Sequence, residues 1–160
     1  MKKTFILVLT LITFACFANI TPIETKAAEP PSPTIEMLEN GYYYETIIVD
    51  AETEGISSRA ASNTITKTKT TQLKNSSGSV LWSVSITATF TYDGSTSKCT
   101  SCTPSARSYA STWSIKSVTS SKSGNSATAT AIAVQTTAVG TTYEYTKSVT
   151  IKCSATGVIS

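Results

Sequence analysis

The sequence predicts an all-β protein: an antiparallel β-sandwich of the immunoglobulin-like kind, or a small barrel. In residues 79–92, SVLWSVSITATFTY, apolar side chains occupy every second position, and Ser or Thr occupies nearly all the others. Successive side chains of a strand point to opposite faces, so we expect Trp82 to be buried and Leu81 exposed. Ser and Thr supply 45 of the 105 residues from 56 to 160. Thr suits a solvated strand face because its branched Cβ packs on the pleat.

The start of the chain predicts a signal peptide over residues 1–27. Lys2 and Lys3 precede an apolar run at residues 5–20, and small residues follow it at the expected cleavage site. The run is shorter than the about 20 apolar residues that cross a membrane as a helix, so we expect no transmembrane anchor. Cys16 lies inside the run, and lipid attachment there is an alternative to release. We therefore expect a secreted, extracellular protein that can stay associated with the cell envelope.

Two short segments are expected between the signal peptide and the β domain. Residues 28–41 include EPPSP, whose prolines forbid regular structure, and predict a Pro-rich acidic linker. Residues 42–58 form an acidic segment in which YYYETIIV, residues 42–49, predicts one strand. Residues 59–160 then form the Ser/Thr-rich β domain, and we expect the acidic part before it to be flexible.

Charge is divided unevenly along the chain. Residues 29–55 hold seven acidic side chains and no basic one, whereas residues 56–160 carry a formal +8, from ten Lys or Arg minus Asp93 and Glu144. One interpretation is a solvated acidic leader with one strand laid on the sheet. The other is a pro-segment that shields a basic body until cleavage at Arg59.

Six strands are predicted in the β domain, and turn residues separate them. Asp93-Gly94 is a strong hairpin signal, and KNSSGS, KSGN and VGT supply other turns. The alanines of ATATAIAV share one face, where small side chains leave room for the rings of Trp82 or Trp113. Lys147 interrupts the apolar row of the last strand, and its long side chain can reach solvent near an edge. The predicted strands cover residues 64–73, 79–92, 97–101, 112–118, 127–135 and 141–154.

Three cysteines follow the signal peptide, and export implies an oxidising setting in which disulfides persist. Alternation places Cys99 and Cys102 on opposite faces of their strand, while Cys153 continues the apolar row of the last strand. We therefore predict a Cys99–Cys153 disulfide, which closes a loop of about 55 residues and stabilises the fold by roughly 4 kcal/mol. Cys102 is then a free thiol, a loop bridge with either partner, or a link between two chains, so the oligomeric state stays open.

The residue inventory argues against an enzyme. The chain has no histidine, which removes the usual general base at neutral pH and the commonest metal ligand. Asp93 is committed to a turn, which leaves Glu144 without a partner for paired-carboxylate glycosidase chemistry in the β domain. No Gly-x-Ser-x-Gly elbow, phosphate loop or dinucleotide fingerprint occurs. Three cysteines leave a zinc site without its fourth ligand, so we expect neither a cofactor nor a metal.

The basic β domain predicts a binding module. Lys67, Lys69, Lys147 and Lys152 lie on Thr-rich strands and are candidates for binding cell-wall polyanions or glycans. The simpler interpretation is that they keep strand edges soluble. Nucleic acid is not expected, because the aromatic residues fall on buried positions rather than among the basic ones. Lysines within TITKTKTT also argue against a flat threonine array for an ordered surface such as ice. The alternative function is a processed secreted effector of the antibacterial type, released from the acidic pro-segment.

Two motifs carry a resemblance to a known group: GSVLWSVSITATFTYDGSTSKCTS, residues 78–101, and SVTIKCSATG, residues 148–157. Over residues 42–160 the chain resembles small secreted proteins of Gram-positive bacteria that carry an uncharacterised β-rich domain of unknown function. The resemblance implies export and a compact β domain, and it supplies no catalytic residue. Cys102 departs from the two-cysteine pattern of that group.

Overall fold

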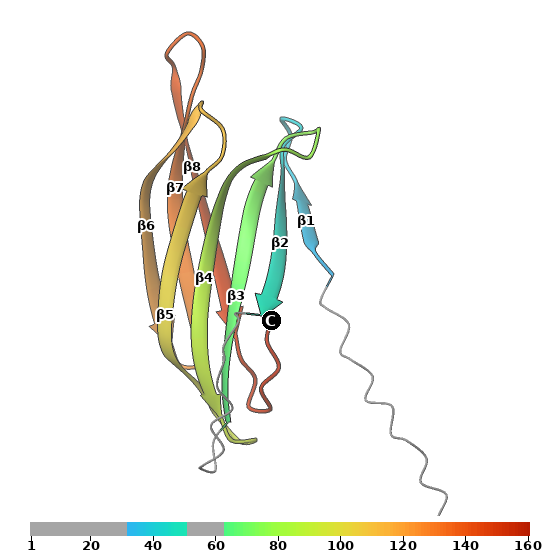
Figure 1. Ribbon diagram of the computed structural model, residues 1–160, viewed down its shortest axis with the longest axis vertical. Helices are drawn as coiled ribbons and strands as arrows, with labels where there is room; N and C mark the ends of the chain where they lie inside the picture. The colour runs from blue at the N-terminus through green and yellow to red at the C-terminus, as the bar shows by residue number, and fades with distance from the viewer. Residues whose placement is uncertain (1–31, 51–62) are drawn as a thin grey trace, which may run out of the picture.

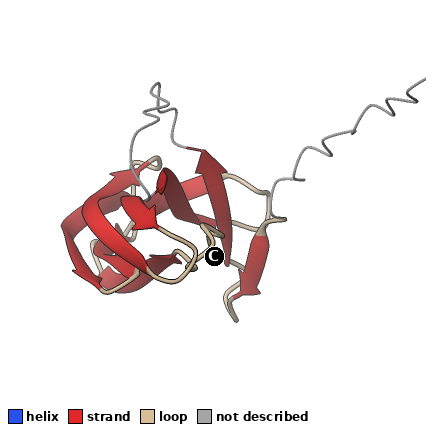
Figure 2. Cartoon of the chain, turned by 90° about the horizontal axis from the view of Figure 1, so that it is seen from below, coloured by secondary structure: helices blue, strands red, loops and turns tan. Residues whose placement is uncertain are grey.

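The computed structural model describes residues 32–50 and 63–160, and these contain eight β-strands and no helix (Figures 1 and 2). The predicted signal peptide with Cys16, and the predicted processing site at Arg59, lie outside the described residues. The strands in chain order are β1 (Thr34–Met37), β2 (Tyr43–Asp50), β3 (Asn63–Lys74), β4 (Val80–Tyr92), β5 (Ser97–Ser108), β6 (Trp113–Ser123), β7 (Ser126–Thr136) and β8 (Thr142–Lys152).

The strands form two antiparallel sheets that follow chain order. β1 to β5 make a five-stranded sheet, and β6 to β8 make a three-stranded sheet. The smaller sheet lies against β3, β4 and β5 of the larger one, and the view from below shows the layers around a common interior (Figure 2). The fold is therefore the predicted β-sandwich and not a closed barrel. Each sheet is a meander of sequential strands, which differs from the Greek-key connections of an immunoglobulin domain.

The period of two in β4 produces the predicted two-faced strand. Five alternate side chains of β4 are at most 1% exposed. On the opposite face, hydroxyls of β3 and β4 pair across the strands, as between Thr68 and Thr87 at 2.7 Å. Lys67 and Lys69 lie on the interior face of β3, opposite buried residues of β4. The prediction that they interrupt the outer threonine row is therefore wrong. The buried five are Trp82, Val84, Ile86, Ala88 and Phe90.

Leu81 is buried, although strict alternation predicts it exposed. In the pairing of β3 with β4, Leu73 faces Trp82, but Lys74 faces Val80. Leu81 is therefore the extra residue of a β-bulge, which bends the strand and interrupts the alternation of faces. As a result its side chain joins the core and is 9% exposed.

The alanine row of β7 lets large rings fill the interior. These alanines are at most 1% exposed, and β7 lies against β4 and β5. Trp82 and Trp113 stack with ring centroids 6.5 Å apart, and Tyr145 of β8 packs on Trp113 with centroids 4.8 Å apart. Small side chains on β7 thus leave space for the rings, as the sequence predicts. The buried row is Ala127, Ala129, Ala131 and Ala133.

Three strands differ from the sequence prediction in place or extent: β1, β5, and β6, which ends at Ser123 rather than at residue 118. β1 lies inside the predicted Pro-rich linker, and its four side chains are all exposed, so no buried alternation marks it. It is held by pairing with β2, which is the predicted strand of the acidic segment. β5 continues well past residue 101, its predicted end, and includes Pro104. Proline is tolerated there because β5 is an edge strand of its sheet.

Candidate anion-binding groove

The larger sheet extends beyond the smaller sheet, and lysines of its strand β3 lie beside the edge of the smaller sheet. Lys67 faces Ala88 and Lys69 faces Ile86 in the register of β3 with β4, so both lysines lie on the interior face of the sheet. β8 is the edge strand that lies against β3, whereas β1 and β2 extend beyond the smaller sheet. The strip of β1 to β3 and the edge of β8 form the two walls of a groove.

A cavity of about 270 Å³ lies in this groove. Lys69 and Lys147 are the cations of its lining, and Glu36 is the carboxylate that the described residues contribute. Both walls carry hydroxyl groups, so the cavity offers ammonium and hydroxyl donors from two sheets. The hydroxyl-bearing residues are Thr34, Thr46, Thr71, Ser148 and Thr150.

Lys147 is held in the groove by two residues of the larger sheet. Its Nζ lies 4.0 Å from the ring centre of Tyr44 and donates a hydrogen bond of 2.6 Å to Oε2 of Glu36. Burial raises the pKa of Tyr44 to about 12, and the Glu36 carboxylate is the second cause of this rise. The ring thus stays neutral and presents its face to the ammonium. The Tyr44 ring, the Glu36 carboxylate and solvent together stabilise the Lys147 ammonium. This explains why a lysine can interrupt the apolar row of β8.

Lys69 and Lys152 approach each other from different sheets. Burial lowers the pKa of Lys69, and repulsion from Lys152 lowers it further. Both causes disfavour the charged form of Lys69, and an anion placed beside the two lysines would reverse that effect. A titratable group that is perturbed in this way inside a cleft is a candidate for a functional site.

Two of the four predicted lysines therefore line one groove, and a third lies close to one of them. Lys69 and Lys147 line the cavity, and Lys152 is near enough to Lys69 to affect its pKa. Lys67 lies two residues away from Lys69 on the same face of β3 and is not part of the described lining.

Glu36 and Tyr44 also belong to this groove, and no sequence pattern predicts either of them there. Glu36 lies on β1, which has no buried alternation in the sequence. Tyr44 is the last of three consecutive tyrosines and is followed by a polar residue, so the pattern does not show which tyrosine faces inward. The register with β3 decides this, because Tyr44 pairs with the buried Leu73.

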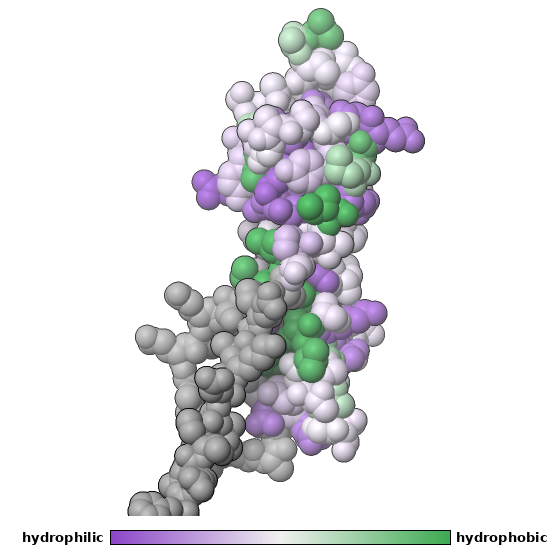
Figure 3. All heavy atoms as spheres, turned by 90° about the vertical axis from the view of Figure 1, so that its right-hand side faces the viewer, coloured by the Kyte–Doolittle hydropathy of each residue, from purple (hydrophilic) through white to green (hydrophobic). Residues whose placement is uncertain are grey.

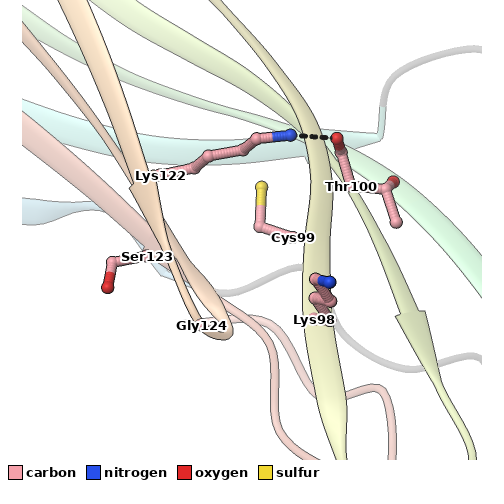
Figure 4. A pocket seen from close by; sticks show the side chains of 6 residues that line it. All are labelled: Lys98, Cys99, Thr100, Lys122, Ser123 and Gly124. Carbon is pink, nitrogen blue, oxygen red and sulfur yellow. Dashed lines mark hydrogen bonds between the residues drawn. The ribbon is translucent and has the colours of Figure 1, made fainter.

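A second cavity, of about 450 Å³, lies between the start of β5 and the hairpin of β6 and β7 (Figure 4). The sulfur of Cys99 points into this space, and the ammonium of Lys122 donates to the Thr100 carbonyl oxygen. Both lysines of this cavity are exposed, whereas Lys69 and Lys147 are half-buried. The groove that contains Lys69 and Lys147 holds its cations more firmly than the larger cavity does, so it is the stronger candidate for an anion-binding site. The larger cavity is lined by Lys98, Cys99, Thr100, Lys122, Ser123 and Gly124.

The three described cysteines are unpaired, so the predicted Cys99–Cys153 disulfide is not formed in this structure. Both side chains are buried, at 3% and 0% exposure, in agreement with the alternation. However, the thiols point to different acceptors: Cys99 to the carbonyl of Ser101 at 3.3 Å, and Cys153 to that of Ser154 at 3.4 Å. Burial raises the pKa of both thiols, so they are protonated at neutral pH.

Cys102 lies on the same face of β5 as Cys99, contrary to the prediction. Cys99 pairs with Phe90 and Cys102 with Ala88, and these two partners are alternate residues on the core face of β4. The extra residue is Thr100, in a β-bulge that interrupts the alternation. Alternation therefore does not separate the two cysteines by face, and a link between chains through Cys102 remains one of the alternatives given above.

Within residues 32–50 and 63–160, no three His, Cys, Asp or Glu side chains lie together in a way that could hold a metal ion. The same residues contain no helix that is long and apolar enough to span a membrane. Comparison with family models, with curated proteins and with solved structures finds no match to the chain.

Proposed function

We propose that this protein is a secreted or cell-envelope-associated β-sandwich module that binds envelope polyanions or glycans through the groove, and that it is not an enzyme. The observation that carries this proposal is that Lys69 and Lys147, from different sheets, line one cavity, with Lys152 close enough to affect the pKa of Lys69. Converging cations raise the local concentration of an anionic polymer. The resemblance to small secreted proteins of Gram-positive bacteria agrees with such a role outside the cell.

The surface near β1 supports a polar ligand rather than an apolar one. Figure 3 shows the side of the molecule that carries β1, and its described surface is mostly pale or purple with scattered green areas. Ile35 and Met37 of β1 are exposed apolar residues, but they alternate with Thr34 and Glu36, which line the cavity. The groove itself therefore presents hydroxyl and charged groups.

Binding to purified cell walls tests the proposal. Retention is expected to fall steeply with salt, because exposed charges are screened over about 10 Å at 0.1 M ionic strength. The double variant Lys69→Gln, Lys152→Gln is expected to bind roughly five- to tenfold more weakly, since it removes one cation of the groove lining and the cation beside it. Dissociation constants at several salt concentrations measure both effects.

The matched control is Lys98→Gln, Lys122→Gln, which removes the same charge from the larger cavity. It is expected to change binding by less than about twofold, as distant surface charges are largely screened. Equal weakening by both double variants would mean that net charge, and not the groove, is responsible. Equal retention on walls stripped of anionic polymer would contradict polyanion binding.

The alternative function, an effector released from an acidic pro-segment, has less support. β2 pairs with β3 along its whole length, and Tyr44 packs edge-to-face on Trp82 with centroids 6.3 Å apart. Acidic residues of this region also form ion pairs with the body, Glu45 with Lys74 among them. Loss of the segment would remove two strands and part of the core, which favours a permanent role in the fold.

A further inference from the structure

Glu36 brings a carboxylate into a groove whose other charged lining residues are cations. Its side chain is 61% exposed, whereas that of its partner Lys147 is 19% exposed. Glu36 lies on β1, a strand of four exposed residues at the edge of the larger sheet. An ion pair with such an exposed partner contributes little to stability. An external anion could therefore replace this carboxylate at small cost.

Lys147 has a second support that does not depend on Glu36. Its Nζ lies 4.0 Å from the Tyr44 ring centre, and Tyr44 is 6% exposed and packed on Trp82. A cation over an aromatic face keeps its three N–H donors for other acceptors. The ammonium therefore stays oriented in the groove when its carboxylate partner is exchanged.

The opposite wall supplies hydroxyl donors beside a second cation. The hydroxyl oxygens of Thr46 and Thr71 lie 2.8 Å apart, so one hydroxyl hydrogen lies between them and the other can serve a ligand. Lys69 is two residues from Thr71 on the same face of β3, and all three residues line the cavity. This arrangement suits a ligand group with several acceptor oxygens.

We infer that the groove binds a phosphate group of a phosphodiester polymer between Lys147 and Lys69, and that Glu36 is the internal carboxylate which this phosphate displaces. The inference rests on the proposed function, because it names the ligand group of the same groove. A phosphodiester carries one negative charge on two free oxygens, which accept from ammonium groups on both walls. The lysines act as point charges, and the hydroxyls add directional hydrogen bonds.

Calorimetric titration of the mature chain with poly(glycerol phosphate), and with poly-glutamate of matched charge, tests this inference. Glu36→Gln is expected to tighten binding of the phosphodiester polymer by roughly two- to fivefold, because it removes a competing exposed ion pair. The matched control is Glu144→Gln. Glu144 also forms an exposed ion pair, with Lys116, and neither residue belongs to the cavity lining, so this variant should leave binding nearly unchanged.

Lys147→Gln is expected to weaken binding and to abolish the gain from Glu36→Gln in the double variant. If Lys147→Gln does not fold, the comparison of Glu36→Gln with Glu144→Gln decides, since both glutamates are exposed. Absence of binding to either polymer by the unmodified chain would overturn the proposed function. Binding with equal effects of the two glutamate variants would overturn the role of Glu36 alone. Equal or tighter binding of poly-glutamate would overturn the choice of phosphate.

Discussion

Trp82→Ala is expected to lower the free energy of unfolding by about 3–5 kcal/mol, the usual range for removal of a buried aromatic ring. The Trp82 ring is 1% exposed. It stacks on Trp113 and meets the edge of Tyr44, with ring centroids 6.5 Å and 6.3 Å away. Its loss would open a cavity in the interior and remove the support of Tyr44 under the groove. Equilibrium unfolding in denaturant measures the change.

Two controls separate ring packing from general effects at this position. Trp82→Phe keeps a ring and removes the indole Nε1, which is buried without a hydrogen-bond partner among the described residues. Its cost is expected to stay under about 2 kcal/mol, because an unsatisfied donor is itself unfavourable. Tyr143→Ala removes a ring that is 53% exposed and should cost less than about 1 kcal/mol. Equal losses at Trp82 and Tyr143 would contradict the core described above.

Ala131→Leu is expected to destabilise the fold by about 1–3 kcal/mol, because extra methylenes in a filled interior force neighbouring side chains out of place. Ala131 is 0% exposed, and its strand lies against β4 and β5. Thr130→Leu is the matched control, since residue 130 belongs to the opposite, solvent-facing side of β7. This control should change stability by less than about 1 kcal/mol. A neutral Ala131→Leu would show that the alanine row does not limit the space for the rings.

Local alternation was sufficient to predict the strands whose one face is buried. In β7, and in β4 from Val84 onward, the pattern identifies the core residues because burial there follows a period of two. It fails at Leu81, which is the extra residue of one bulge, and at Cys102, which follows the extra residue of another, and the sequence signals neither bulge. It also failed at β1, which buries no side chain and is held by pairing with β2. A pattern of buried residues can report only on strands that bury residues.

The sequence predicts which lysines are candidates for binding, but it does not predict the geometry of the groove. The sequence predicts Lys69 and Lys147 as basic residues on Thr-rich strands, whereas their position in one groove depends on the packing of one sheet against the other. Tyr44 and Glu36 complete the site only because β1 and β2 extend beyond the smaller sheet. No pattern within a single strand contains that information, since the contacts join segments far apart in the chain.

Lysine reactivity with and without a bound polymer tests the groove most directly. Acetylation followed by mass spectrometry would report each lysine separately while poly(glycerol phosphate) saturates the protein. We expect Lys69, Lys147 and Lys152 to become protected, and Lys98 and Lys122 of the larger cavity to react as before. Protection of all five to the same degree, or of the larger cavity alone, would contradict binding in the groove.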